Sequence, residues 1–299
     1  MHELLDPKVL AQIKNLPLLS KKIIEGTMSG LQHSHQKGAG LEFSQYRNYE
    51  QGDDLRLIDW KLFARTDRYY VRESLRESLV DVWFLLDCSA SMGQPSQRID
   101  NWTRFDYAKH LIASLASIIT KHGDAPGLIA LNDQQLEFID AHRGQRHLEA
   151  LIDSLSNIKL GQQWPAEEQL ETMWEHIKRP AMIVIVSDGI QASDELEQLV
   201  NKFTAAGREV INFQLLTEAE RHFNFKGNLA LRDPETDERI NVNTPMSRKA
   251  YLETFEAYLE ELQKAMRMKG VDHREVLIES PLDESLRNFL NHRLKGVGF

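Results

Sequence analysis

The chain has 299 residues, of which 41% are hydrophobic and 27% are charged, a composition typical of a globular protein rather than a disordered one. It carries 36 Lys and Arg against 45 Asp and Glu, for a formal net charge of −9. This charge disfavours a nucleic-acid-binding function, because the phosphate backbone selects for basic protein surfaces.

Residues 1–80 form the first predicted region, a polar module with helical and extended parts. Hydrophobic residues near helical spacing predict a helix over residues 8–25. Residues 29–40 are rich in Gly and polar side chains and are typical of a loop or an irregular strand. A dense polar and aromatic block follows over 42–78, and its segment 55–60 is predicted to be extended and partly buried.

The polar block has two interpretations. In the first, its charged residues hold the module against the rest of the chain. In the second, it is a partner-binding surface, because several arginines cluster beside tyrosines, and both residue types are enriched at the centres of protein interfaces. The residues of this candidate surface are Arg65, Arg68, Tyr69 and Arg72.

From residue 81 to 299, apolar strands alternate with amphipathic helices. Strands are predicted over 82–86, 128–131, 137–139, 182–186, 210–216 and 275–278. Helices are predicted over 104–122, 145–157, 166–178, 194–206, 247–269 and 282–294. The alternation predicts a doubly wound α/β fold, with a mostly parallel sheet covered by helices on both faces.

One segment interrupts this alternation. Over residues 222–245, two short runs flank the turn sequence Asp-Pro-Glu-Thr-Asp at positions 233–237. Such a turn between two extended runs predicts a β-hairpin insertion.

The chain is expected to be a cytoplasmic protein without a membrane span. Its longest purely apolar run, residues 181–186, is far shorter than the roughly 20 residues that a helix needs to cross a bilayer. The first residues lack the basic start and long apolar run of a signal peptide. The single cysteine, Cys88, suits a reducing compartment and excludes a disulfide framework or a cysteine-rich zinc site.

Oxygen-bearing side chains follow two of the predicted strands. Asp87, Ser89 and Ser91 come after the strand 82–86, and Asp188 comes after the strand 182–186. Open α/β sheets bind ligands beyond the carboxyl ends of their strands. Hard oxygen ligands suit Mg²⁺, Mn²⁺ or Ca²⁺ rather than zinc, so these four residues are the predicted metal ligands. The alternative is that the same residues only cap helices.

These motifs resemble a known family. Asp87, Ser89 and Ser91, with the later Ser-Asp-Gly at 187–189, resemble the metal-ion-dependent adhesion site of von Willebrand factor A domains. The stretch 46–61, Tyr-Arg-Asn-Tyr-Glu-Gln-Gly-Asp-Asp-Leu-Arg-Leu-Ile-Asp-Trp-Lys, is similar to the signature of domain-of-unknown-function family 58. That von Willebrand A-like family is often associated with AAA+ ATPases of the MoxR class. The resemblance implies a von Willebrand A-like fold and a MoxR-type ATPase as partner.

The sequence departs from the adhesion-type pattern at one position. Such sites usually have a Thr after a Gly on a middle loop. The counterpart here is Gly161-Gln162-Gln163, which contains no Thr. Gln163 is therefore the candidate for an oxygen ligand on that loop.

Three functions remain open. The first is a non-catalytic interaction module, an adaptor or cofactor of the ATPase, whose bound cation accepts a carboxylate from a partner. The second is a metal-dependent phosphoester hydrolase, with Asp87 and Asp188 holding Mg²⁺ against a phosphate. The sequence shows no general base and no positioned Lys or Arg near either loop, and Cys88 is expected to be a small buried residue rather than a nucleophile. The third is a structural subunit with a vestigial metal site, which the missing Thr favours.

Overall fold

The computed structural model describes residues 4–6, 45–49, 58–73, 80–134, 136–177, 181–190, 195–225 and 227–296. The chain divides into two compact units, one of residues 21–78 and one of residues 79–299 together with residues 1–20. Leu4 belongs to the hydrophobic core of the larger unit, whereas the predicted boundary assigned it to the N-terminal module. The predicted helix over 8–25 and loop over 29–40 lie outside the described residues.

The smaller unit consists of strand β1 (Gln45–Asn48), helix α3 (Trp60–Thr66) and strand β2 (Tyr70–Glu73), with β1 and β2 antiparallel. The carboxylate of Asp59 accepts hydrogen bonds from the backbone amides of Lys61 and Leu62 at 2.9 and 3.0 Å. This cap starts α3 at Trp60, so the prediction of an extended, partly buried segment is wrong at Trp60. It is confirmed at Ile58, which is buried and forms a β-bridge with Val71. Trp60 is helical and 58% exposed.

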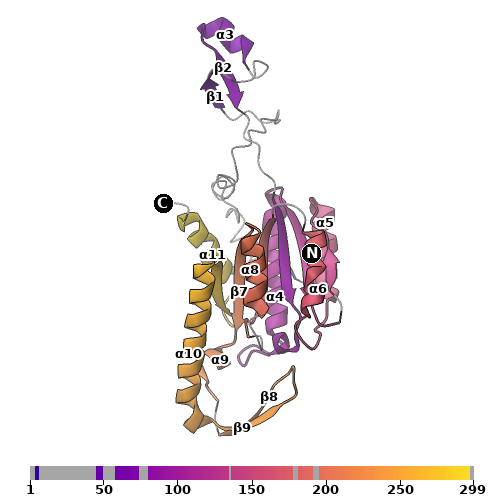
Figure 1. Cartoon of the computed structure of the whole chain (residues 1–299), viewed down its shortest axis with the longest axis vertical. Coiled ribbons are helices and arrows are strands. Elements are labelled where there is room, and N and C mark those ends of the chain that lie inside the picture. The colour runs from indigo at the N-terminus through magenta and orange to yellow at the C-terminus, as the bar shows by residue number, and fades with distance from the viewer. Residues whose placement is uncertain are drawn as a thin grey trace. The chain divides into compact units, whose positions relative to one another are not determined.

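A six-stranded sheet forms the centre of the larger unit (Figure 1). Its strands, in spatial order, are β10 (Asp272–Leu277), β7 (Glu209–Leu216), β6 (Ala181–Ser187), β3 (Asp81–Asp87), β4 (Ala125–Leu131) and β5 (Glu137–Ile139). All neighbouring strands are parallel except the edge strand β5, which is antiparallel to β4. If these six strands are renumbered 1 to 6 along the chain and read from the β5 edge, their order is 3-2-1-4-5-6. This is the doubly wound topology that the strand–helix alternation predicts.

Helices cover both faces of this sheet. Alternate residues of β3 point to opposite faces: Phe84 joins one hydrophobic core and Leu85 joins the other. The first core contains residues of α4 (Arg104–Lys121), α5 (Gln145–Asn157) and α11 (Leu282–Gly296). The second contains residues of α6 (Glu167–Glu171), α7 (Met173–His176), α8 (Glu195–Ala205) and α10 (Thr244–Met268). Burial on both faces explains why β3 is a continuous apolar run.

The predicted helix over 166–178 is broken into α6 and α7. At Thr172 the backbone amide donates to the carbonyl of Gln169, and the amide of Glu175 donates to the carbonyl of Thr172. These bonds span three residues instead of four, and the Thr172 hydroxyl also donates to the Gln169 carbonyl. The tighter turn interrupts the α-helical bonding, which hydrophobic periodicity does not reveal.

The β-hairpin insertion is confirmed, as strands β8 (Asn228–Arg232) and β9 (Arg239–Asn243). A short helix that the sequence reading did not include, α9 (Glu218–His222), precedes the hairpin. A reciprocal capping box between Thr217 and Glu220 starts α9. Counting the 25-residue α10 that follows the hairpin, no helix in the described part of the chain is long and apolar enough to cross a bilayer.

Candidate functional site

The four predicted metal ligands lie together at the carboxyl edge of the sheet. Asp87 ends β3, and Asp188 directly follows β6, the parallel neighbour of β3. Ser89 precedes the 3₁₀ helix η2 (Ala90–Gly93), which contains Ser91. The side chains of Asp87 and Asp188 are 0% and 1% exposed, so this edge of the sheet holds two carboxylates away from bulk water.

The hydroxyl oxygens of Ser89 and Ser91 lie 3.0 Å apart. An octahedral Mg²⁺ with oxygen ligands at about 2.1 Å places adjacent ligands about 3.0 Å apart, so the two hydroxyls have the spacing of neighbouring Mg²⁺ ligands. The described residues contain no group of three or more His, Cys, Asp or Glu side chains placed to hold a metal ion. Hydroxyls and water would therefore have to supply most of the ligands of an ion here.

Burial and mutual repulsion disfavour the charged forms of the carboxylates of the site. Burial, followed by the charge of Asp188, raises the pKa of Asp87 to about 8. Burial also raises the pKa of Asp188, although its ion pair with Arg104 opposes the shift. The backbone amide of Ser89 donates to Asp87 at 2.9 Å, and the amide of Ile190 donates to Asp188 at 3.0 Å. These hydrogen bonds offset only part of the cost of burying two like charges.

Arg104, the first residue of α4, is a site residue that the sequence reading missed. Its side chain is 2% exposed, and its Nη1 donates to the carboxylate of Asp188 at 2.7 Å and to the carbonyl of Ser91 at 3.2 Å. Its Nη2 forms an ion pair with Glu220 of α9. The expectation that no Lys or Arg is positioned near these loops is therefore wrong. Arg104 stands at the start of α4, so the guanidinium comes from a helix that begins 84 residues before Asp188 in the chain.

The middle loop, residues 161–163, which lacks the expected Thr, lies against the site. The amide of Gly161 donates to the carbonyl of Cys88 at 2.7 Å, and the amide of Ala90 donates to the carbonyl of Gln162 at 3.1 Å. A Cβ on Gly161 would lie 2.6 Å from the carboxylate of Asp133, so the close approach of this loop requires glycine. Gln163 is exposed on the loop, and its role as an oxygen ligand stays a prediction.

A third carboxylate reaches the site from the hairpin. Glu235, in the turn between β8 and β9, lies near the hydroxyls of Ser91 and Ser89. Burial raises the pKa of Glu235, while these two hydroxyls lower it. The turn sequence predicted the hairpin, but nothing in it indicated that this side chain meets loops more than 140 residues away along the chain.

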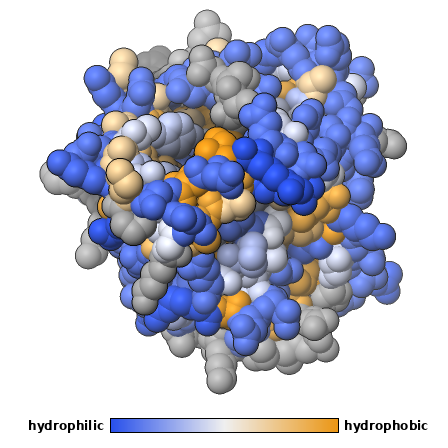
Figure 2. Space-filling model, turned by 90° about the horizontal axis from the view of Figure 1, so that it is seen from below, coloured by the Kyte–Doolittle hydropathy of each residue, from blue (hydrophilic) through white to orange (hydrophobic). Residues whose placement is uncertain are grey.

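Figure 1 places the hairpin below the carboxyl edge of the sheet, and Figure 2 shows the molecule from that side. The face is largely hydrophilic, with apolar side chains gathered near its centre. Exposed apolar residues on segments that end at this edge include Ile190, Leu231 and Ile240. Apolar side chains surrounded by polar ones are an arrangement that protein–protein interfaces also show.

Cys88 is fully buried within the same loop, and its thiol lies 3.5 Å from the carbonyl of Leu86. Burial and the neighbouring Asp87 raise the pKa of the thiol. A thiol that resists ionisation is a poor nucleophile, which agrees with the interpretation of Cys88 as a small buried residue.

The candidate partner surface lies in the smaller unit. Arg65 and Arg68 are exposed. Tyr69 is 49% exposed and stacks on Phe63, with their ring centroids 4.4 Å apart. Arg72 belongs to β2, but its side chain lies outside the described part of the structure. A partner-binding role for these residues stays a prediction.

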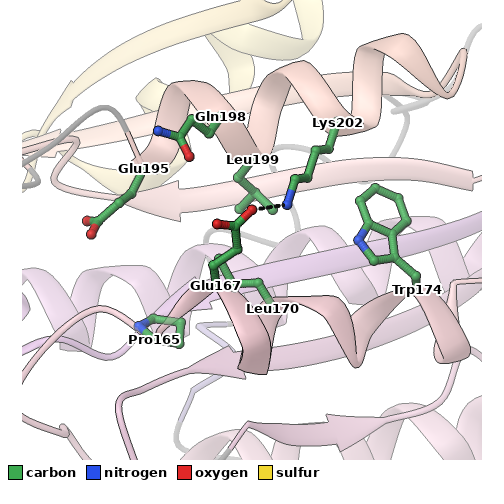
Figure 3. A pocket seen from close by; sticks show the side chains of 8 residues that line it. All are labelled: Pro165, Glu167, Leu170, Trp174, Glu195, Gln198, Leu199 and Lys202. Carbon is green, nitrogen blue, oxygen red and sulfur yellow. Dashed lines mark hydrogen bonds and ion pairs between the residues drawn. The ribbon is translucent and has the colours of Figure 1, made fainter.

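A separate pocket of 210 Å³ opens between α6, α7 and α8 (Figure 3). In it, Lys202 of α8 and Glu167 of α6 point toward each other and form an ion pair at 2.7 Å, with Trp174 of α7 to one side. None of the residues that line it belongs to the acidic site. The pocket is smaller than the roughly 300 Å³ at which small-molecule sites begin, and its central charges already neutralise each other.

The comparisons with known proteins agree with the motifs. A family model described as "Protein of unknown function DUF58" matches residues 45–265. The chain is 25% identical over 237 residues to the uncharacterized protein Mb1516 of Mycobacterium bovis (strain ATCC BAA-935 / AF2122/97), an alignment covering 77% of this chain and 72% of that protein.

Solved structures also match the chain. One is BatB, a conserved hypothetical protein from Bacteroides thetaiotaomicron, at 14% identity and a TM-score of 0.44, covering 72% of this chain and 99% of that one. Another is the VWA domain of SpRpn10, at 13% identity and a TM-score of 0.42, covering 70% of this chain and 94% of that one. Since the family model spans most of the chain, from β1 into α10, the protein belongs to the DUF58 family of proteins of unknown function.

Proposed function

We propose that the chain is a non-catalytic, cytoplasmic interaction module that binds a carboxylate of a partner protein through a divalent cation. The observation that carries this proposal is the pair of Ser89 and Ser91 hydroxyls, 3.0 Å apart beside two buried carboxylates. Asp87, Ser89 and Ser91 would hold the cation, and Asp188 would orient Ser91. A bound cation would offer a coordination position to an incoming carboxylate.

The composition of the site favours Mg²⁺ or Mn²⁺. The four predicted ligands, Asp87, Ser89, Ser91 and Asp188, all contribute oxygen, which suits a hard cation. The two serine hydroxyls lie near the carboxylates of Asp87, Asp188 and Glu235. A divalent cation held by the hydroxyls would offset the repulsion between these carboxylates.

Phosphoester hydrolysis is less well supported than partner binding. A hydrolase of this kind needs a positioned cation to stabilise the phosphoryl group in the transition state. Arg104 contacts both acidic loops, at Asp188 and at the carbonyl of Ser91, but it is 2% exposed. Its donors are engaged by Asp188, Glu220 and the carbonyl of Ser91. It serves to neutralise the interior of the site rather than to receive a phosphate.

The proposed partner is an AAA+ ATPase of the MoxR class, for which this chain would act as an adaptor or cofactor. Membership in the DUF58 family supports this partner, because that family is often associated with ATPases of this class. The exposed residues Arg65, Arg68 and Tyr69 of the smaller unit offer a second surface for the same partner.

The test measures binding of the full chain to a purified MoxR-type ATPase, with Mg²⁺ and with EDTA. Asp87→Ala should abolish Mg²⁺-dependent binding, whereas Asp100→Ala, which removes an exposed carboxylate, should leave it unchanged. Titration with Mn²⁺ should show binding to the wild type and to Asp100→Ala only. If Asp87→Ala binds the ATPase as tightly as the wild type in both buffers, the metal-bridged proposal is refuted. If the wild type binds no Mn²⁺, the site is vestigial.

A further inference from the structure

The outer part of the β8–β9 hairpin is exposed except at one side chain. Over residues 230–240, every residue is exposed apart from Glu235, which is partly buried at the tip of the turn. A glutamate side chain in a turn is normally exposed to solvent. Here the carboxylate turns inward, so the hairpin presents it to the acidic site.

Two sets of contacts hold Glu235 in this place. Its carboxylate lies near the hydroxyls of Ser91 and Ser89, two of the predicted metal ligands, and these hydroxyls lower its pKa. Its backbone is fixed by the side chain of Gln162, whose Nε2 donates to the carbonyls of Pro234 and Glu235 at 2.8 and 3.1 Å. The tip of the hairpin is therefore attached to the middle loop of the site.

The turn itself is ordered by Asp233. The carboxylate of Asp233 accepts hydrogen bonds from the amide of Glu235 at 2.9 Å and from the hydroxyl of Thr236 at 2.8 Å. The amide of Asp233 donates to the carbonyl of Glu238 at 2.9 Å, which closes the turn. This local order reduces the entropy lost when Glu235 is placed at the site.

We propose that Glu235 is an internal ligand of the metal site and occupies the coordination position that the partner's carboxylate takes. The inference rests on the proposed function and deepens it, because the hairpin then keeps the site closed until a partner displaces it. A tethered ligand has an effective concentration of order millimolar, so a single free carboxylate competes poorly with it. Only a partner protein that makes further contacts with this face would then displace Glu235, which makes the site specific for such partners.

The charge of the site supports this arrangement. Glu235 lies close enough to Asp87 and Asp188 to interact with both charges, and Arg104 is the cation that contacts this cluster among the described residues. Bringing a third carboxylate to two buried ones is unfavourable without a cation. A divalent ion reverses the sign of that interaction, so the ion and the closed hairpin should stabilise each other.

The test uses Mn²⁺ as the probe on the full-length chain, comparing the wild type with Glu235→Gln and Asp87→Ala. Glu238→Gln is the matched control, because it removes the same charge from an exposed position of the same turn. Water-proton relaxation reports how many water molecules coordinate the bound Mn²⁺. Hydrogen exchange of the amides of residues 228–243 reports whether the hairpin closes.

The expected result is that Glu235→Gln weakens Mn²⁺ binding by about tenfold or more, since even groups that only orient ligands contribute about 10–100-fold. Its bound Mn²⁺ should gain a water molecule, which excess acetate displaces, whereas acetate should not change the wild type. Mn²⁺ should slow hairpin exchange in the wild type and in Glu238→Gln, and leave it unchanged in Glu235→Gln.

The outcomes separate this inference from the proposed function. If Mn²⁺ binds through Asp87 but Glu235→Gln matches Glu238→Gln in affinity, hydration and hairpin exchange, the internal ligand is refuted while the metal-bridged module stands. If the wild type binds no Mn²⁺, or Asp87→Ala binds it equally well, the proposed function and the internal ligand are both refuted.

Discussion

Replacing Arg104 with Met tests how the site is held together without metal. The substitution keeps a long side chain that fills the space beneath the loops but removes the guanidinium. Asp188, which is 1% exposed, then loses its 2.7 Å ion pair, and Glu220 of α9 also loses its ion pair with Arg104. We expect a large loss of unfolding free energy, because an uncompensated charge would remain buried.

The size of the expected loss of unfolding free energy depends on how deeply Asp188 and Glu220 are buried. Removing one member of a buried ion pair costs about 3–5 kcal/mol. An interaction at about 4 Å with an effective dielectric constant of about 20 gives about 4 kcal/mol, which agrees with that range. Most of this loss belongs to the fully buried pair with Asp188, because Glu220 is 20% exposed and solvent screens its charge.

The assay is urea unfolding in EDTA, followed by tryptophan fluorescence. Arg98→Met is the matched control, because the pair of Arg98 with Glu218 is 66% and 30% exposed and should contribute less than about 1 kcal/mol. The double variant Arg104→Met/Asp188→Asn should recover much of the loss, since it removes both buried charges. If Arg104→Met loses no more stability than Arg98→Met, the electrostatic explanation of the site is wrong.

Two further predictions concern stability. Burial lowers the pKa of His273 to about 4 from 6.5, so the unfolded chain takes up a proton below pH 6.5 that the folded chain does not. The unfolding free energy should therefore fall by at most about 3 kcal/mol between pH 6.5 and 4, and His273→Gln should flatten this dependence in urea titrations; equal slopes would contradict it. Gly189→Ala should lower the unfolding free energy by about 1–3 kcal/mol more than Gly207→Ala. Both glycines have a φ near +70°, but a Cβ at Gly189 would lie 2.9 Å from Gln214 whereas Gly207 is open, so equal losses in thermal unfolding would refute the steric argument.

The sequence by itself determines the layered α/β architecture. The apolar run of β3 follows from burial on both faces of the sheet, and the amphipathic pattern of α5 follows from burial on one side of a helix. Both regularities repeat within a few residues. The Thr-x-x-Glu capping box at residues 217–220 was also present as a signal for α9, although the reading of the hairpin segment did not use it. Asp87, Ser89, Ser91 and Asp188 could be grouped because the carboxyl ends of neighbouring parallel strands meet.

Only the tertiary structure decided which groups complete the site. Arg104 pairs with Asp188 and Glu220, which lie 84 and 116 residues away along the chain. Glu235 reaches the serine hydroxyls only because the hairpin folds against the carboxyl edge of the sheet. Hydrophobic burial produces a periodic pattern in the sequence, because a buried position recurs at every turn of a helix and at every second residue of a strand. An ion pair or a single inward-turned carboxylate depends on one distance between distant segments, and no local pattern of residues records that distance.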